Sequence, residues 1–276
     1  MKPAPFDYTR ASSVDEAIKL IASGEGDVMP IAGGQSLVPL LALRMTTPER
    51  LVDIGRIDAL RQVSASASQV TIGAAITHAE IEDGCVPDPA NGLMRRVAAG
   101  IAYRAVRNQG TIGGSIALAD PAADWSACLI ALRAKAHIAG PNGERTMLVE
   151  ELIDGIYSTK LERGELILAF DIPKLAASTR TGLAKVARKT GAFAMSLAIA
   201  VHDGANVATR VVLGGAGSKP LCLHQTSKLV REKAVGESAV RDAIAHDLDW
   251  LDADLDGYAR RLHTVTLLRA IAEASP

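Results

Sequence analysis

Two pairs of adjacent glycines are the residues of this sequence best suited to bind a ligand. They lie at residues 33–34 and 113–114, and hydroxyl-bearing side chains flank both, Ser36 in one segment and Thr111 and Ser115 in the other. Adjacent glycines let the backbone adopt positive φ and let several N–H groups converge on an anion without a Cβ in the way. A single pair would more often be an ordinary turn. Two such loops predict a pyrophosphate held from both sides.

The spacing of the glycines argues against the common nucleotide-binding motifs. Neither loop has the Gly-x-Gly-x-x-Gly pattern of a Rossmann dinucleotide site. A third cluster, Gly-Gly-Ala-Gly-Ser-Lys at residues 214–219, lacks the Gly-x-x-x-x-Gly-Lys spacing of a P-loop, and no apolar helix follows Pro220. We interpret this third cluster as a turn that leaves a strand.

The composition limits how an anion could be bound. The chain has 276 residues, 48% of them apolar, and its 30 basic residues nearly balance 31 acidic ones. No cationic patch stands out, so a phosphate would be held mainly by backbone N–H groups. The balance also argues against a nucleic-acid partner. No apolar run approaches the ~18 residues of a membrane span, and the N-terminus lacks the features of a signal peptide, which predicts a cytoplasmic protein without membrane insertion.

The cysteines and histidines predict no metal site in this chain. Cys85, Cys128 and Cys222 are isolated, with no Cys-x-x-Cys pair. That spacing excludes an iron–sulfur cluster or a structural zinc of the usual kind, and we expect three buried thiols. The six histidines are scattered, and none is paired with a cysteine at ligand spacing. We interpret them as surface or hydrogen-bonded side chains.

The elements before residue 176 place both glycine loops at junctions of secondary structure. Hydrophobic periodicity, capping residues and turn residues together define them. Thr77 and Glu80 form a capping box, and Asp120-Pro121 is a helix-start signal. The expected elements are a helix at 13–24, a strand at 28–31, a helical stretch to 43, a strand at 51–54, a hairpin at 60–75, a helix at 93–106, a helix from 120, a hairpin that turns at 140–143 and a strand at 166–172.

A second domain is predicted after a linker at residues 173–181, which is rich in Ala, Ser and Thr. Strands followed by helices indicate an α+β domain with an antiparallel sheet. The expected elements are strands at 183–188, 195–202 and 207–213 and helices at 238–248 and 257–274. The predicted boundaries are 1–176, with subdomains of about 1–57 and 58–176, and 177–276.

At the two glycine loops the sequence resembles the flavin subunits of the molybdenum hydroxylases. Ala-Gly-Gly-Gln-Ser-Leu at 32–37 and Arg-Asn-Gln-Gly-Thr-Ile-Gly-Gly-Ser at 107–115 look like the two FAD motifs of that family. The family includes the medium subunits of carbon monoxide, nicotine and quinoline dehydrogenases and the flavin domain of xanthine dehydrogenase. The resemblance covers nearly the whole chain. Asp-Pro-Ala-Ala-Asp at 120–124, Gly-Glu-Leu-Ile at 164–167 and Ala-Arg-Lys-Thr-Gly-Ala-Phe at 187–193 also match.

The resemblance implies an α+β fold with a two-part FAD-binding domain of the p-cresol methylhydroxylase/vanillyl-alcohol oxidase type. A C-terminal domain of the carbon monoxide dehydrogenase flavoprotein type would follow, with a three-stranded antiparallel sheet and helices. The cofactor would be noncovalent FAD, because no histidine looks like a covalent attachment site. The implied cofactor-binding residues are Ala32, Gly33, Gly34, Gln35, Ser36, Leu37, Ile101, Thr111, Ile112, Gly113, Gly114, Ser115, Asp124, Leu161, Lys185 and Phe193.

Two of these transferred residues also have a simpler interpretation. Asp124 would contact FAD by the resemblance, but a carboxylate near a helix start also favours the helix dipole. Phe193 would lie against the isoalloxazine ring, but it could equally be an ordinary core residue.

The resemblance implies an electron-transfer role without catalytic residues for the organic reaction. Molybdopterin and [2Fe–2S] centres would reside in a large and a small partner subunit, in a dimer of heterotrimers, and FAD here would pass electrons to an external acceptor. Gln35, where carbon monoxide dehydrogenase relatives often carry histidine, leans toward an N-heterocyclic or similar substrate of the complex. A self-sufficient FAD-dependent oxidoreductase and a nonenzymatic anion-binding module are the alternatives. Substrate turnover by the single chain would support the first, and a colourless protein that takes up no FAD the second.

Overall fold

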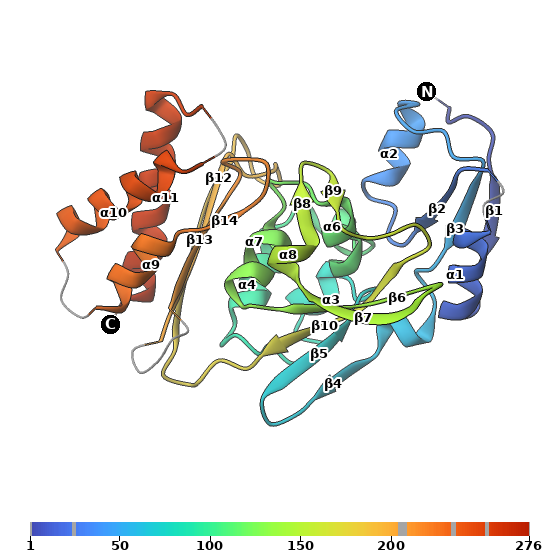
Figure 1. Ribbon diagram of the computed structural model, residues 1–276, viewed down its shortest axis with the longest axis horizontal. Helices are drawn as coiled ribbons and strands as arrows, with labels where there is room; N and C mark the ends of the chain where they lie inside the picture. The colour runs from blue at the N-terminus through green and yellow to red at the C-terminus, as the bar shows by residue number, and fades with distance from the viewer. Residues whose placement is uncertain (1, 24–25, 204–208, 233–235, 252–253, 276) are drawn as a thin grey trace.

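The computed structural model describes residues 2–23, 26–203, 209–232, 236–251 and 254–275. Figure 1 shows three sheets along the long axis of the molecule, with the N-terminal sheet at one end, a central sheet in the middle, and a C-terminal sheet covered by helices at the other end. Helices and sheets are mixed throughout, which confirms the predicted α+β class. No helix of the described residues is long and apolar enough to cross a membrane.

The N-terminal sheet is parallel, in the order β1-β3-β2. Helix α1 buries Ala17, Ile18 and Ile21 in one cluster with the sheet. Because the strands are parallel, their carboxyl ends lie at one edge of the sheet, and the first glycine loop begins at that edge. The elements are β1 (Asp7–Arg10), α1 (Val14–Ala22), β2 (Val28–Ile31), α2 (Leu37–Ala42) and β3 (Arg50–Asp53).

The central sheet is antiparallel, in the order β4-β5-β10-β6-β7. Both predicted hairpins are present in it. Its core includes the fully buried Ile72, Phe170 and Trp125, and every residue of α7 is buried. The strands are β4 (Val63–Ala65), β5 (Gln69–Gly73), β6 (Lys135–Gly140), β7 (Gly143–Leu148) and β10 (Leu166–Pro173), with a separate ribbon of β8 (Ile153–Gly155) and β9 (Ser158–Thr159). The helices are η1 (Asp58–Arg61), α3 (His78–Glu82), α4 (Leu93–Ala99), α5 (Arg104–Arg107), α6 (Ile112–Leu118), α7 (Asp124–Ala131) and α8 (Val149–Leu152).

The C-terminal sheet packs on the central domain through β12. Leu197, Ile199 and Val201 belong to the core cluster that contains α7, whereas Ala198 and Ala200 belong to the cluster of the C-terminal helices. This alternation is the period of two of a strand that is buried on both faces. The elements are β11 (Arg180–Val186), β12 (Ser196–His202), β13 (Arg210–Gly214), β14 (Leu221–Cys222), α9 (His224–Arg231), α10 (Glu237–Asp249) and α11 (Gly257–Ala274).

Two features of this domain extend the prediction from sequence. The two-residue strand β14 joins the three predicted strands in the order β11-β12-β13-β14, and α9 precedes the two predicted helices. The glycine cluster at 214–219 is a turn after β13, as predicted. The first residues of the predicted strand at 207–213 lie outside the described residues.

The predicted helix at 93–106 is broken into α4 and α5, which corrects the prediction. Gly100 ends α4, and Ala102 adopts a positive φ of 43°. The guanidinium of Arg107 donates to the carbonyl oxygens of Ile101 and Ala102, at 2.9 and 3.2 Å, and is itself paired with Glu82. Arg107 therefore satisfies the carbonyl groups that the break leaves without helical partners.

Helix α7 begins at Asp124, later than the Asp120-Pro121 signal predicts. The Asp120 carboxylate accepts from the N–H of Ala122 at 2.8 Å and from the hydroxyl of Tyr157 at 3.2 Å. Asp120 thus stabilises a turn before the helix, and Asp124 occupies the first helical position.

Candidate functional site

The two glycine loops, residues 32–36 and 111–115, lie next to each other although they are distant in the sequence. A Cβ built on Gly33 would lie 2.0 Å from the carbonyl oxygen of Gln109 and 2.9 Å from the Cα of Gly110. No side chain larger than hydrogen fits at that approach without moving one of the loops. Gly33 is therefore required by the contact between the loops, and its φ is not positive.

The first loop presents a run of unpaired backbone donors. Within the described chain, the N–H groups of residues 33–37 donate to no acceptor, whereas the N–H of Val38 donates to the carbonyl of Gly34 at 2.9 Å. Gly34 adopts a φ of 69°, and the hydroxyl of Ser36, at the N-cap of α2, makes no capping hydrogen bond. Successive N–H groups that turn around a left-handed residue form a concavity that suits an anion.

The backbone of the second loop is already engaged, which distinguishes it from the first. The N–H groups of Ile112 and Gly113 donate to the carbonyls of Ile76 and Ala74, at 3.0 and 2.9 Å, and the N–H of Gly114 donates to Oγ1 of Thr111 at 3.1 Å. A Cβ on Gly113 would lie 2.5 Å from the Cβ of Ala74. Close approach to the hairpin therefore explains this glycine.

Of the four glycines in the two loops, only one adopts a positive φ. Gly34 has it, while Gly33, Gly113 and Gly114 do not. Gly114 is exposed within α6, and a Cβ there would approach only Oγ1 of Thr111, at 2.9 Å. The hydroxyl of Ser115 makes no hydrogen bond among the described residues. The second loop thus presents an open glycine surface and a hydroxyl to its surroundings.

A buried ion pair lies at the start of α7. The Nζ of Lys185, on β11, lies 2.8 and 2.9 Å from the two carboxylate oxygens of Asp124 and donates to the carbonyl of Gly100 at 3.0 Å. The side chains are 7% and 18% exposed for Asp124 and Lys185. Burial raises the pKa of Asp124 above its ordinary value, although the charge of Lys185 opposes that rise. Asp124 is therefore more than a residue that favours the helix dipole, because it joins α7 to the C-terminal sheet.

The remaining predicted site residues lie near the break between α4 and α5. Ile101, in the break, and Leu161, after β9, are half-buried against the central core. A Cβ on Gly191 would lie 3.0 Å from the ring of Tyr103, which places the segment that carries Phe193 beside the break. Phe193 is 60% exposed, so its interpretation as a core residue is wrong.

A polar cleft adjoins the point where the loops meet, and reasoning from sequence missed it. It has a volume of about 780 Å³ and lies between the carboxyl ends of the N-terminal strands and the start of α3. The signal that could have indicated it is the general preference of ligands for the carboxyl ends of parallel strands. Its polar side chains are Tyr8, Arg10, Asp53, Arg56, Asp58, Arg61, Thr77, Glu80, Asp83, Asn108, Gln109 and Thr111.

Asp53 organises the N-terminal wall of this cleft. Its carboxylate accepts hydrogen bonds from the Tyr8 hydroxyl, from Arg10 at 3.3 Å and from the N–H of Gly55 at 2.9 Å. Burial opposes ionisation, but these donors hold the pKa of Asp53 below its ordinary value. Asp53 is therefore ionised at neutral pH, and Arg10 compensates its charge.

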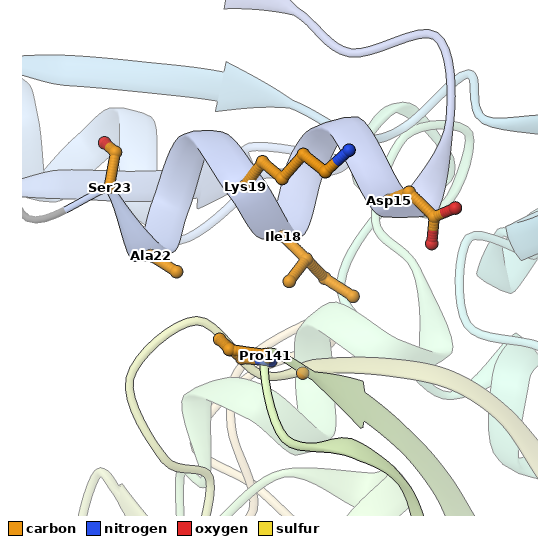
Figure 2. Close-up of a pocket in the computed structure, with 7 residues that line it drawn as sticks. Asp15, Ile18, Lys19, Ala22, Ser23 and Pro141 are labelled. Carbon is orange, nitrogen blue, oxygen red and sulfur yellow. The ribbon is translucent and has the colours of Figure 1, made fainter.

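A second hollow of about 500 Å³ separates α1 from the turn between β6 and β7. Figure 2 shows Ile18 and Ala22 on the side of α1 that faces Pro141, while Asp15 and Lys19 lie along the same helix. None of the predicted site residues lines it. It is a gap between α1 and the turn that joins β6 to β7, without a chemical cluster of its own.

Neither the cysteines nor a cluster of metal-ligating side chains contributes to the candidate site among the described residues. Cys128 and Cys222 are buried as predicted, but Cys85 is exposed, which corrects the third prediction. Among the described residues, no group of three or more His, Cys, Asp or Glu side chains could hold a metal ion.

Comparison with known proteins gives consistent matches over nearly the whole chain. A family model described as the FAD binding domain in molybdopterin dehydrogenase matches residues 4–175. The 6-hydroxypseudooxynicotine dehydrogenase complex subunit alpha of Paenarthrobacter nicotinovorans is 31% identical, over 99% of this chain and 94% of its own length. The glyceraldehyde dehydrogenase medium chain of Sulfolobus acidocaldarius is 32% identical, over 100% of both chains. A solved structure of carbon monoxide dehydrogenase from Hydrogenophaga pseudoflava matches with a TM-score of 0.93 at 32% identity, covering 99% of this chain and 98% of its own.

Proposed function

This chain belongs to the family of FAD-binding domains in molybdopterin dehydrogenases, and on that premise we propose that it relays electrons from an iron–sulfur subunit to an external acceptor. It is a FAD-binding medium subunit of a molybdenum hydroxylase-type dehydrogenase, and so part of an oxidoreductase. Bound FAD supplies one-electron and two-electron redox chemistry, while the protein binds, orients and tunes it. The observation that carries the proposal is the run of unpaired donors in a loop that contacts a second glycine loop.

The two loops fit a pyrophosphate in complementary ways. In the proposed site the N–H groups of residues 33–37 and the Ser36 hydroxyl donate to the phosphate oxygens from one side. The exposed surface of Gly114 and the hydroxyl of Ser115 face them from the other side, while Thr111 and the hairpin hold the second loop in place. Neutral dipoles directed at an anion replace its hydration without a fixed cation. The open surface at Gly114 is suited to close approach because no Cβ projects there.

The residues around the break between α4 and α5 form the ring side of the proposed site, where the isoalloxazine ring of FAD would lie. Asp124, held by Lys185, offers a carboxylate of fixed position for hydrogen bonding to the cofactor. Ile101 and Leu161 offer apolar contacts, and the exposed ring of Phe193 excludes water from the cofactor. The polar cleft at the carboxyl ends of the N-terminal strands is the proposed position of the adenosine end.

The electron path requires partners, because three cysteines without a cluster spacing supply no iron–sulfur relay. In the proposed assembly, a large molybdenum subunit hydroxylates the organic substrate and a small [2Fe–2S] subunit passes electrons to the FAD held here. A dimer of heterotrimers is the proposed stoichiometry, and the cytoplasm is the proposed location. We propose an N-heterocycle or similar organic compound as the substrate of the complex, because Gln35 stands where carbon monoxide dehydrogenase relatives often carry histidine.

Reconstitution tests the proposal. The purified chain should be yellow, or should take up FAD, and acid or heat should release the flavin intact. Substrate-dependent reduction of an artificial dye should require both partner subunits. Dye reduction by this chain alone, at rates like those of the complex, would establish a self-sufficient flavoenzyme instead. A chain that binds no FAD would refute the site, and a flavin that stays with the denatured chain would refute noncovalent attachment.

A further inference from the structure

A buried histidine and tryptophan connect the second glycine loop to the helix that begins with Asp124. The Nε1–H of Trp125 donates to Nδ1 of His78 at 2.9 Å, and the two residues are buried, His78 6% exposed and Trp125 0% exposed. An indole N–H is only a donor, so Nδ1 of His78 must be the acceptor and its proton must reside on Nε2. The bond therefore fixes both the tautomer and the orientation of the imidazole.

The opposite edge of the same imidazole packs on the entry to the second loop. A Cβ built on Gly110 would lie 2.8 Å from Nε2 and 2.9 Å from Cδ2 of His78, so only a glycine fits there without displacing the ring. The backbone N–H of His78 donates to the carbonyl of Gly110 at 2.9 Å, and Thr77 and Thr111 form an antiparallel bridge. Two kinds of contact thus hold the second loop: the backbone hydrogen bonds and bridge with residues 77–78, and the packing of Gly110 against the imidazole edge.

These contacts place His78 between the two parts of the proposed FAD site. Trp125 directly follows Asp124, the carboxylate of the proposed ring side, and Gly110 directly precedes Thr111 of the proposed phosphate side. We propose that the His78–Trp125 pair is a positioning pair that sets the place of the second glycine loop relative to α7, and so selects for ligands that carry the diphosphate. The inference rests on the proposed FAD site.

The local charges agree with an imidazole that acts in its neutral form. Burial, and secondarily the charge of Arg107, lower the pKa of His78 to about 4. Arg107 is paired with Glu82, and Glu80 at the same helix start is paired with Arg61 and closes the capping box on Thr77. The charged groups around the ring therefore have partners of their own, and Nδ1 stays free to accept from Trp125 near neutral pH.

Two single substitutions separate the two contacts. Trp125→Phe removes the donor and leaves a buried acceptor without a partner. His78→Asn keeps an acceptor near the place of Nδ1 but removes the edge that supports Gly110. Affinities for FAD, ADP and riboflavin are measured on the full chain by titration. We expect FAD and ADP each to bind about tenfold more weakly to both variants, because Trp125→Phe leaves the buried Nδ1 of His78 without a donor and His78→Asn leaves Gly110 without the imidazole edge. Riboflavin, which lacks phosphate, should bind as it does to the unsubstituted chain.

A third variant, Gly110→Ala, tests the packing directly when it is compared with and without His78→Asn. Gly110→Ala places a methyl group against the imidazole, so it should weaken FAD binding in the unsubstituted chain. In the His78→Asn background the two contacts with the imidazole are gone and only the approach to the Val106 carbonyl, at 3.2 Å, remains, so adding Gly110→Ala should cost clearly less affinity than in the unsubstituted chain. A cost that is equal in both backgrounds would show that the imidazole edge does not support the loop.

The matched control is His263→Asn in the C-terminal domain. His263 is 3% exposed, and its Nδ1 lies 2.9 Å from Oγ of Ser196, so the same substitution also disturbs a buried hydrogen-bonded imidazole. It should lower the unfolding temperature and leave all three affinities unchanged. If the Trp125 and His78 variants behave like this control, the pair is only structural and the inference is wrong. If the unsubstituted chain itself fails to bind FAD, the proposed function fails instead.

Discussion

Removing the ammonium group of Lys185 should expose how strongly the two domains depend on one buried ion pair. Lys185→Met keeps a side chain of similar length but leaves the Asp124 carboxylate, 7% exposed, without its countercharge. Removing one partner of a buried pair costs about 3–5 kcal/mol, because the other charge remains in a poorly solvated place. The carbonyl of Gly100 loses its donor at the same time. We therefore expect a loss in the free energy of unfolding of about 3 kcal/mol or more at pH 8.

The loss should depend on pH in a defined direction. The folded-state pKa of Asp124 already lies above its ordinary value, because of burial, and Lys185 is the group that opposes the rise. Without Lys185 the pKa of Asp124 rises further. A carboxyl group whose pKa is raised in the folded state favours folding less as the pH rises through that value. The variant should therefore lose more stability at pH 8 than at pH 5.

Urea denaturation at both pH values measures this effect. Adding Asp124→Asn to Lys185→Met should restore part of the stability at pH 8, because a neutral amide costs less to bury than an unpaired carboxylate. The reasoning is refuted if Lys185→Met unfolds at pH 8 with the free energy of the unsubstituted chain, or if its deficit is the same at both pH values.

Three further predictions concern the loops and His78. Gly33→Ala, whose methyl group would lie 2.0 Å from the Gln109 carbonyl, should separate the loops and weaken FAD binding at least about tenfold, whereas Gly155→Ala, with nothing within 4 Å, should not. Gly114→Val should keep the fold, judged by circular dichroism, and lose FAD in a fluorescence titration. The lowered pKa of His78 means that the unfolded chain binds more protons between pH 4 and 6.5, so the free energy of unfolding should fall by up to about 3 kcal/mol as the pH falls through that range, and less in His78→Asn.

Local patterns predicted the strand and helix on either side of the first loop, because those patterns act over short distances, but they did not predict α6, the helix that carries the second loop. The capping box of Thr77 and Glu80 forms with both of its hydrogen bonds, and the glycine pairs fall at a strand-to-helix junction and a helix start. The sequence did not show which contact requires each glycine. Gly113 is needed because Ala74 lies against it, and that contact depends on a hairpin far away in the sequence.

Two of the errors, at the helix break and at the start of α7, share a cause, which is competition from partners distant in the chain. Periodicity alone favours one helix at 93–106, but Arg107, anchored by Glu82, binds the carbonyls of the break. The Asp120-Pro121 signal is locally sound, but Tyr157 engages the carboxylate in a turn. The local sequence around Asp120 does not show that its carboxylate binds the Tyr157 hydroxyl. The start of α7 could therefore not be located from the sequence.

The near balance of charges in the composition has a structural counterpart at the loops. Four arginines close to the second loop or the cleft are each held by a carboxylate, whereas Arg56, which is exposed and lines the cleft, makes no ion pair among the described residues. The pairs are Arg10 with Asp53, Arg61 with Glu80, Arg104 with Asp83 and Arg107 with Glu82. Cations engaged in this way are poor partners for a phosphate, because binding it would require breaking a pair that already exists. The unpaired N–H groups of residues 33–37 carry no such cost, since they have no acceptor to give up. The pairing of these four arginines therefore supports the proposal, as the net charge does, that backbone dipoles hold the diphosphate and that the paired arginines stabilise the walls around it.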